Sequence, residues 1–281
     1  MALGGVRSCG VTTLALALTS TWPHDQRVLL VELDPAGGTL AAASGWPPEP
    51  SLVSLAAAAR RDSDPELVWA HCHALPGGAP VLAGPASADQ TRTALGMLAG
   101  LLGRLDELVG DVLVDCGRLA GDTPSAIAVR PVLAGADRVV LAARPRLADL
   151  HALATWLDAN PSVREPAQLV LVGDGPYPDA EVREALGVDV LARLPWDPDA
   201  AEGLVSAPAT ARELKVAPLV RAARTLAEHM SDRAAPVGTS RVEVVAPFGP
   251  ATALRTRVLR VWRPAPAVRS TNGSAPKEAS R

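Results

Sequence analysis

The stretch GVRSCGVTT at residues 5–13 decides the fold. It matches the phosphate-loop pattern G-x-x-x-x-G-K-[ST] at every fixed position except one, because Val11 stands where that pattern has lysine. In such a loop, backbone N–H groups and the start of the following helix surround phosphate oxygens, and these groups do not depend on the lysine. An ordinary glycine-rich turn that begins a helix explains the same residues. As a phosphate loop, the stretch predicts ligand contacts at Gly5, Arg7, Ser8, Cys9, Gly10, Val11, Thr12 and Thr13.

Beyond this loop, short continuous apolar runs alternate with helical patterns. The runs lie at residues 28–32, 112–115, 138–142, 169–172 and 191–194. The helical patterns lie at residues 12–21, 51–61, 91–108, 147–160, 179–186 and 209–229. Continuous apolar runs are typical of strands buried on both faces, and their alternation with helices predicts right-handed βαβ units. We therefore expect an α/β fold, a doubly wound and mostly parallel sheet flanked by helices, with ligands at the carboxyl ends of the strands.

The 281 residues divide at a shift in composition after Met230. From Ser231 to Arg281, nine basic and three acidic side chains give a charge of +6, so the total of −3 leaves −9 on residues 1–230. We predict one domain over residues 1–230 and a basic, partly disordered tail over 231–281, rich in Pro, Ala and Arg. An acidic body with a basic tail suggests contact with nucleic acid, an anionic membrane or the body itself, although a solvated tail explains the charges equally well.

Two segments of the tail carry apolar residues. Residues 242–245 fit a short strand, and residues 254–262 fit either a helix or a strand. As a helix, the second segment has an apolar side and a side with arginines, the arrangement of helices that lie on anionic membranes. A strand that pairs with residues 242–245 explains the segment at least as well.

Cysteine usage and hydropathy set the expected compartment. Cys9, Cys72 and Cys116 form no C-x-x-C pair, which fits a reducing environment. His71 and His73 flank Cys72, but alternate side chains of a strand point to opposite faces, so we expect no zinc site there. No signal peptide and no apolar run long enough to span a bilayer are evident. We expect a cytoplasmic protein, with peripheral membrane contact through the tail as the alternative.

Five segments, in order, resemble the ParA/MinD family of ATPases, which includes the CpaE-like pilus-assembly proteins. Residues 5–13 resemble the family's deviant loop GKGGVGKTT. VLLVELDPAGG at 28–38 resembles its VLLIDLDPQGN, and DVLVDCG at 111–117 resembles its Walker B segment DYVIIDTPPG. ADRVV at 136–140 resembles ADEVLLV, and LPWDP at 194–198 resembles the I-P-Y-D strand end near the family's adenine site. The resemblance covers residues 1–230 and implies a P-loop fold of the SIMIBI type.

The resemblance also implies roles for individual residues. Thr12 and Asp115 match the residues that hold Mg²⁺, directly or through water, and Glu32 matches the first acidic residue of the second segment. We include all three in the candidate metal set. Asp34 matches the acidic residue that helps position the attacking water, which makes it the candidate catalytic residue. ATP and Mg²⁺ are the implied cofactors, and a second copy of the chain or another ATPase is the implied partner.

The sequence departs from the family where the lysines should be. The family's signature lysine falls on Val6 and its second lysine on Val11, while Lys215 and Lys277 are the chain's only lysines. Arg7 offers a charge near the loop. Loss of an oriented cation removes transition-state stabilisation on the order of several kcal/mol, or about a thousandfold in rate. We therefore expect slow hydrolysis or none.

Two further departures concern the surroundings of the loop. The family's adenine-contacting N-R after the fourth strand reads Val172-Gly173-Asp174 here. Met1–Leu3 is too short for a full strand before the loop. Three hypotheses remain: a ParA/MinD-like protein of the positioning, chromosome-partitioning or pilus-assembly kind that binds ATP, a scaffold without nucleotide, and an active ATPase whose cation comes from Arg7 or a partner.

Overall fold

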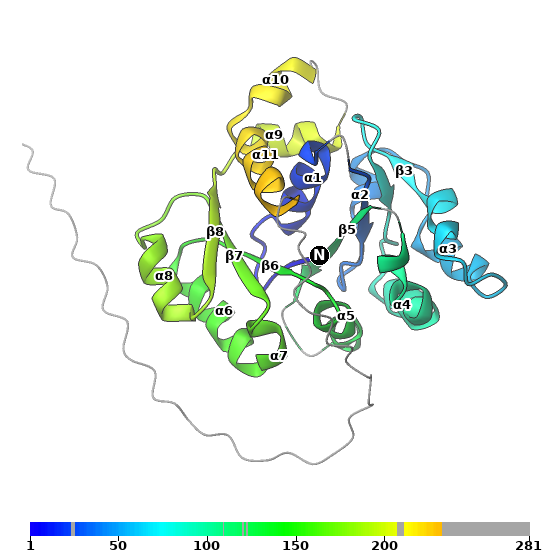
Figure 1. The fold of residues 1–281 in the computed structure, drawn as a ribbon, viewed down its shortest axis with the longest axis horizontal. Coiled ribbons are helices and arrows are strands. Elements are labelled where there is room, and N and C mark those ends of the chain that lie inside the picture. Colours follow the sequence, from blue (N-terminus) through cyan, green and yellow to red (C-terminus); the bar gives the residue numbers. More distant parts are fainter. Residues whose placement is uncertain (24–25, 109, 120, 122, 207–210, 232–281) are drawn as a thin grey trace, which may run out of the picture. The chain divides into compact units, whose positions relative to one another are not determined.

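A computed structural model describes residues 1–231, except 24, 25, 109, 120, 122 and 207–210. Its centre is an eight-stranded sheet in the order β3-β4-β2-β5-β1-β6-β7-β8 (Figure 1). Every neighbouring pair is parallel except β3 with β4. The strands are β1 (Ala2–Gly5), β2 (Val28–Glu32), β3 (His73–Ala74), β4 (Pro80–Leu82), β5 (Asp111–Arg118), β6 (Val139–Ala143), β7 (Ala167–Val172) and β8 (Asp189–Leu194). The predicted doubly wound, mostly parallel α/β sheet is confirmed.

The apolar runs became the buried strands. All five residues of β2 and all five of β6 are buried, as expected where helices cover both faces. The weak run at 191–194 is the end of β8, an edge strand whose residues are mostly only half-buried. Two short strands, β3 and β4, have no matching run, because two or three residues are too few to show a period.

β1 is short, as expected from Met1–Leu3, yet it occupies the middle of the sheet. Its four residues are buried and pair in parallel with β5 on one side and β6 on the other. The Ala2 amide also donates a hydrogen bond to the Arg138 carbonyl at 2.9 Å. Two neighbouring strands therefore fix the place where the phosphate loop begins.

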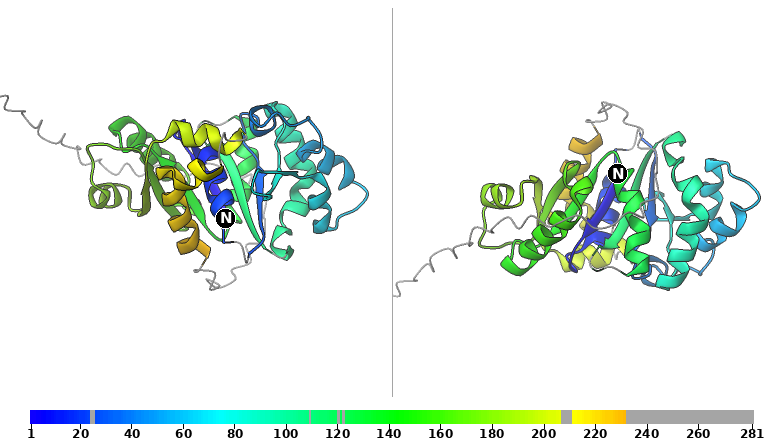
Figure 2. Two further views of the ribbon diagram at one scale, coloured as in Figure 1. Left: turned by 90° about the horizontal axis from the view of Figure 1, so that it is seen from above. Right: turned by 90° about the horizontal axis from the view of Figure 1, so that it is seen from below.

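Helices cover both faces of the sheet (Figure 2). On one face, α1 (Val11–Thr21) packs against α9 (Pro198–Val205) and α11 (Pro218–Ser231). The opposite face carries a chain of contacts through five helices: α4 (Ala88–Leu102), α5 (Pro124–Ala134), α7 (Pro161–Arg164), α6 (Leu147–Ala159) and α8 (Asp179–Leu186). The core between the first group and the sheet includes Leu14, Leu18, Leu30, Val140 and Leu226.

Two predicted helices differ from the observed elements. The pattern at 91–108 begins three residues earlier as α4 and ends in a separate 3₁₀ turn, η2 (Leu105–Glu107). The pattern at 209–229 divides into α10 (Ala211–Val216) and α11, because Pro218 lacks the N–H that a continuous helix requires and instead begins α11. The predicted tail, including the segments 242–245 and 254–262, lies outside the described residues.

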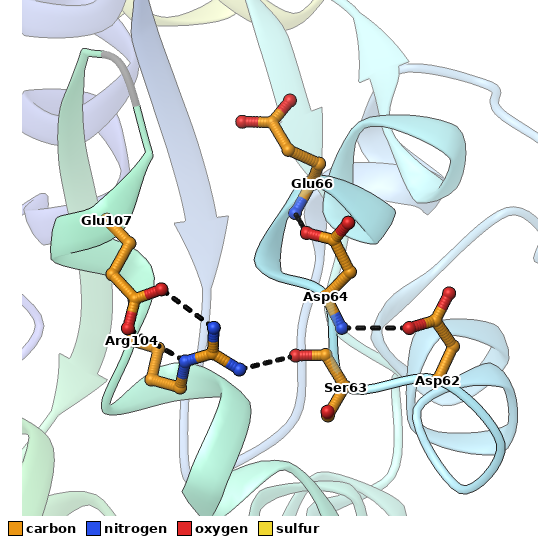
Figure 3. Close-up of polar contacts among 6 residues, drawn as sticks. All are labelled: Asp62, Ser63, Asp64, Glu66, Arg104 and Glu107. Atoms are coloured by element: carbon orange, nitrogen blue, oxygen red, sulfur yellow. Dashed lines mark hydrogen bonds and ion pairs between the residues drawn. The ribbon is translucent and has the colours of Figure 1, made fainter.

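At the sheet edge formed by β3 and β4, the chain between β2 and β3 forms α2 (Leu40–Ala43), α3 (Leu52–Ala58) and the 3₁₀ segment η1 (Pro65–His71). Arg104 connects this edge to the end of α4: its guanidinium donates to Glu107 and, at 2.9 Å, to the Ser63 carbonyl (Figure 3). The two histidines have separate partners: His71 Nδ1 contacts Ser54 Oγ at 2.8 Å, and the His73 ring stacks on Trp46. These contacts hold the edge together at some distance in sequence from the phosphate loop.

Candidate functional site

The phosphate loop joins β1 to α1 in a conformation that requires glycine. Gly10 caps α1 with φ of 89°, a left-handed backbone that side chains rarely adopt, and its carbonyl accepts the Leu14 amide at 2.9 Å. A Cβ added at Gly5 would lie 2.6 Å from Cys9 Sγ and 3.0 Å from the Ala142 carbonyl oxygen. The loop therefore curls tightly onto the end of β6, and its residues wrap the start of α1 as the sequence predicts.

The position of the missing lysine is apolar and packed. Val11 is 6 % exposed, and a Cβ on Gly5 would meet its Cγ2 atom at 2.9 Å. Cys9 is buried beside it, and its thiol donates a hydrogen bond to the Ala142 carbonyl at 3.0 Å. Burial raises the pKa of this thiol to about 12, so it stays neutral. The inner side of the loop thus carries no charge.

The outer residues of the loop face solvent. Arg7 and Ser8 are exposed. Arg7 Nε lies 3.4 Å from Asp149 Oδ1 in the first turn of α6. Since Asp149 already balances the charge of Arg7, this arginine is a poor substitute for the lysine in the conformation observed.

Asp115 and Thr12 meet beneath the loop. Asp115 is fully buried in β5, and its Oδ1 accepts the Gly117 amide at 2.9 Å. Burial raises the pKa of Asp115 to about 7, and a hydrogen-bonding influence from the Thr12 side chain acts to lower it. Asp115 Oδ2 is also buried, and the Thr12 side chain lies close enough to the carboxyl group to act on it as a hydrogen-bond donor. A buried carboxylate beside a hydroxyl is a pair of oxygen donors that would suit a Mg²⁺ ion.

Asp34 lies over the turn that follows Asp115. A Cβ on Gly117, whose φ is 52°, would clash with the Asp34 carboxyl group, so only glycine fits there. The Asp34 carboxylate accepts the Ala36 amide at 2.7 Å. Burial raises its pKa, while the Ala36 amide and the nearby Arg118 lower it. Asp34 and Asp115 therefore lie near each other at the carboxyl ends of β2 and β5.

Glu32 lies beside Asp115 in the sheet, but its carboxylate is already occupied. The two residues are register partners in β2 and β5. Glu32 Oε1 accepts the Thr39 amide at 2.7 Å and the Leu40 amide at 3.1 Å, and Oε2 accepts the Gly84 amide at 2.9 Å. Three backbone donors leave this carboxylate well satisfied. Its geometry favours a part in fixing the loop after β2, so we leave Glu32 out of the metal set proposed below.

A cavity of about 270 Å³ opens beside the loop. Its lining joins the loop and the start of α1 to the carboxyl ends of β7 and β8 and to α9 and α11. The residues that line it are Cys9, Gly10, Thr13, Leu14, Val172, Leu194, Pro195, Trp196, Asp197, Pro198, Ala201 and Leu219. The segment 194–198, which the resemblance places near an adenine site, thus forms one wall of a cavity whose other wall is the phosphate loop.

Sequence reasoning did not single out Trp196, which lines this cavity, or Arg144, which contacts Trp196. From the sequence, Trp196 fits a packing residue, yet it is 56 % exposed and lines the cavity. The Arg144 guanidinium lies 4.1 Å from the centre of the Trp196 ring. A tryptophan directly after the strand-end proline was the available signal, because a large aromatic at a carboxyl strand end stands where ligands bind. No comparable pattern marks Arg144.

The residues that are present fit a Mg²⁺–phosphate ligand better than a protein-only metal site. No group of three or more His, Cys, Asp or Glu side chains suited to a metal occurs in the described part of the chain. Mg²⁺ commonly takes only one or two protein oxygens and completes its shell with phosphate and water. Thr12 and Asp115 supply that kind of donor set.

No family model matches this sequence, and no curated protein matches it, but solved structures do. A ParA family ATPase from Chlorobium tepidum is 19 % identical, matches 82 % of this chain and 98 % of its own, and has a TM-score of 0.66. The cell division ATPase MinD from Pyrococcus furiosus is 19 % identical, with coverage of 82 % and 98 % and a TM-score of 0.63. The septum site-determining protein MinD from Pyrococcus horikoshii, in complex with Mg-ADP, is 20 % identical, with coverage of 82 % and 94 % and a TM-score of 0.62.

These neighbours match most of this chain and nearly the whole of their own length. Identities near 20 % speak for the fold and leave activity open. No helix among the described residues has the length and hydropathy needed to cross a bilayer. The chain has the fold of the ParA/MinD ATPases.

Proposed function

We propose that this chain is a ParA/MinD-like P-loop protein that binds ATP with Mg²⁺, hydrolyses it slowly or not at all, and acts as a positioning, partitioning or pilus-assembly type of regulatory factor. The observation that carries the proposal is the cavity between the phosphate loop and residues 194–198. A volume of about 270 Å³ is close to the lower end for small-molecule sites and suits one end of a nucleotide. The phosphates would then lie along the loop and the start of α1.

In this proposal, each part of the loop has a defined task. The backbone N–H groups between Gly5 and Thr13 and the N-terminus of α1 bind the phosphate oxygens. Thr12 and Asp115 hold Mg²⁺, which offsets the negative charge of the phosphate chain. Asp34, next to Gly117, helps to orient the attacking water. Leu14, Pro195 and Trp196 surround the base.

Slow hydrolysis is proposed because of what stands at position 11. An oriented cation at the phosphates contributes to transition-state stabilisation on the order of several kcal/mol. Val11 has no charge and is packed against the loop. Binding depends mainly on the backbone groups and the cavity, so the lost lysine weakens hydrolysis more than it weakens binding.

A scaffold without nucleotide is the second candidate. The observation in its favour is the apolar packing of Val11 and Cys9 under the loop, where many phosphate loops place a charge. Such a protein would work through a partner, and one solved structure with this fold is a MinC:MinD cell division protein complex from Aquifex aeolicus. In either case we propose that the chain works as a homodimer or with a partner protein.

Calorimetric titration of the purified chain with ATP and Mg²⁺ separates the two candidates. Ala201 lines the cavity, so Ala201→Leu should fill it and weaken ATP binding at least tenfold. Ala148, exposed on α6, provides the matched control, and Ala148→Leu should bind like the wild type. Binding by the wild type that Ala201→Leu abolishes supports the nucleotide proposal. Absence of ATP binding by the wild type would leave the scaffold as the better account.

A further inference from the structure

Arg144 stands directly beside the phosphate loop. It follows β6, whose carboxyl end carries the loop: Cys9 Sγ donates to the Ala142 carbonyl, and a Cβ on Gly5 would lie 3.0 Å from that oxygen. Ala142, which contacts the loop, and Arg144 are therefore only two residues apart in sequence. Arg118, at the end of β5, is the register partner of Gly5, but it is exposed and its charge acts on the Asp34 carboxylate.

The charge of Arg144 is not balanced by an acid. Its side chain is partly buried, and its Nε atom is buried without a hydrogen-bond partner in the described residues. Among those residues it forms no ion pair, whereas Arg7 pairs with Asp149 and Arg193 with Asp179. Its guanidinium instead lies over the Trp196 ring, at 4.1 Å. A buried guanidinium N–H without an acceptor is unfavourable, so an acceptor from outside the chain would relieve it.

The electrostatics of the loop agree with this placement. Burial is the main influence on the pKa of the Cys9 thiol and raises it, while the positive charge of Arg144 acts in the opposite direction. Arg144 is thus near enough to influence the loop. An anion bound on the loop would feel the same charge, in a half-buried setting where screening by solvent is weak.

We propose that Arg144 supplies to the phosphates of the bound nucleotide the positive charge that Val11 lacks. The inference rests on the proposed function and adds a residue from another segment, since the cation comes from the residue after β6 in place of the first residue of α1. Without ligand, the guanidinium rests on Trp196. With ligand, it turns toward the phosphate oxygens, and Trp196 remains as part of the base site. Arginine suits this task because its planar fork binds phosphate through two N–H groups.

In the alternative role, Arg144 only holds Trp196 in contact with the base. A ligand that has phosphates but no base distinguishes this role from the proposed one. Displacement of a fluorescent ATP analogue by unlabelled ATP and by inorganic pyrophosphate, both with Mg²⁺, measures both affinities. The test variant is Arg144→Gln, and Arg144→Lys keeps the charge. Arg146→Gln is the matched control, because Arg146 is exposed and its replacement removes the same charge two residues away. Thermal unfolding verifies that each variant is folded.

We expect Arg144→Gln to weaken both ATP and pyrophosphate by about tenfold or more, the scale of one lost hydrogen bond to a charged group. Arg144→Lys, which keeps the charge but not the fork, should lose less affinity than Arg144→Gln. Arg146→Gln should match the wild type. Unchanged pyrophosphate affinity in Arg144→Gln, or failure of pyrophosphate to displace the analogue from the wild type, would overturn the role of Arg144 alone. A wild type that binds no ATP would overturn the proposed function, and this inference with it.

Discussion

The two sides of the phosphate loop differ in polarity. The side that faces β5 carries a hydroxyl, Thr12, close to a buried carboxylate, Asp115. The side that faces β6 carries Val11 and the neutral thiol of Cys9. One side thus has the oxygen donors that we propose for Mg²⁺, while the other has no charged side chain in the position of the family's lysine. The contrast separates two tasks of such a loop, because binding draws on backbone and metal, and fast phosphoryl transfer also needs the charge.

The largest effect is expected where the two sides join, at Gly5. A Cβ there would lie 2.6 Å from Cys9 Sγ and 2.9 Å from Val11 Cγ2. Gly5→Ala should lower the free energy of unfolding by about 2 kcal/mol or more, as overpacking does in cores. Urea unfolding measures this. Gly96→Ala in α4, where no atom lies within 4 Å, is the control and should stabilise by about 0.5 kcal/mol. A neutral Gly5→Ala would show that the loop is looser than described.

The buried carboxylates on the polar side of the loop should make the free energy of unfolding depend on pH. The folded pKa of Asp115, about 7, lies above its ordinary value of 3.8. Between these values the native state binds more protons than the unfolded state, so stability falls as pH rises from about 4 to about 7. Glu32 and Asp34, whose pKa values are also raised, add to the same trend. Asp115→Asn should therefore lose less stability than the wild type over this range, by on the order of 2 kcal/mol.

Denaturant unfolding at pH 5 and at pH 8, in metal-free buffer, provides the comparison for Asp115. The free energy of unfolding of Asp115→Asn, relative to that of the wild type, should be higher at pH 8 than at pH 5, because the wild-type carboxylate is ionised at pH 8. If the free energy of unfolding changed equally with pH in the wild type and in Asp115→Asn, the buried carboxylate would ionise as easily as an exposed one.

Introducing a lysine at position 11 tests whether the apolar side of the loop lacks a charge. Val11→Lys should tighten ATP binding by about tenfold and raise hydrolysis, provided that Thr12, Asp34 and Asp115 are intact. Val11→Met is the control, since it adds length without charge. Calorimetry measures the ATP affinity, and a phosphate-release assay measures the rate of hydrolysis. If both variants behave alike, charge at position 11 is not what the loop lacks.

The smallest effect is expected at Arg7. Its side chain is 57 % exposed and already paired with Asp149. Exposed pairs contribute about 0–1 kcal/mol, so Arg7→Ala should change stability little and ATP affinity less than about threefold. A loss of ATP affinity as large as that expected for Arg144→Gln would restore Arg7 as the source of the cation.

The sequence predicts the sheet well where burial is continuous and poorly where elements are short. β2 and β6 are apolar almost throughout, so their runs stand out in the sequence. α5 was missed, because Pro131 inside it hides the helical pattern. α9 was indicated only by its cap residue, Asp197, because its eight residues are too few to show a helical pattern. In both cases tertiary packing outweighs a weak local signal.

The candidate site divides in the same way. Thr12, Asp34 and Asp115 follow from motif positions at strand ends, which the topology brings together. Glu32 shares that signal, but its hydrogen bonds run to Thr39, Leu40 and Gly84, and no spacing in the sequence reveals such partners. Arg144 and Trp196 meet only because β6 and β8 belong to one sheet.

The central claim is that ATP binds here without fast turnover. Equilibrium dialysis of the purified chain against ATP and Mg²⁺, with the retained nucleotide extracted and separated over time, measures occupancy and hydrolysis together. We predict that each site retains about one nucleotide at saturation. This nucleotide should still be mostly ATP after a time in which an ordinary enzyme, with a typical kcat of about 10 per second, would have turned over many times. Retention of no nucleotide, or conversion to ADP at that ordinary rate, would contradict the account.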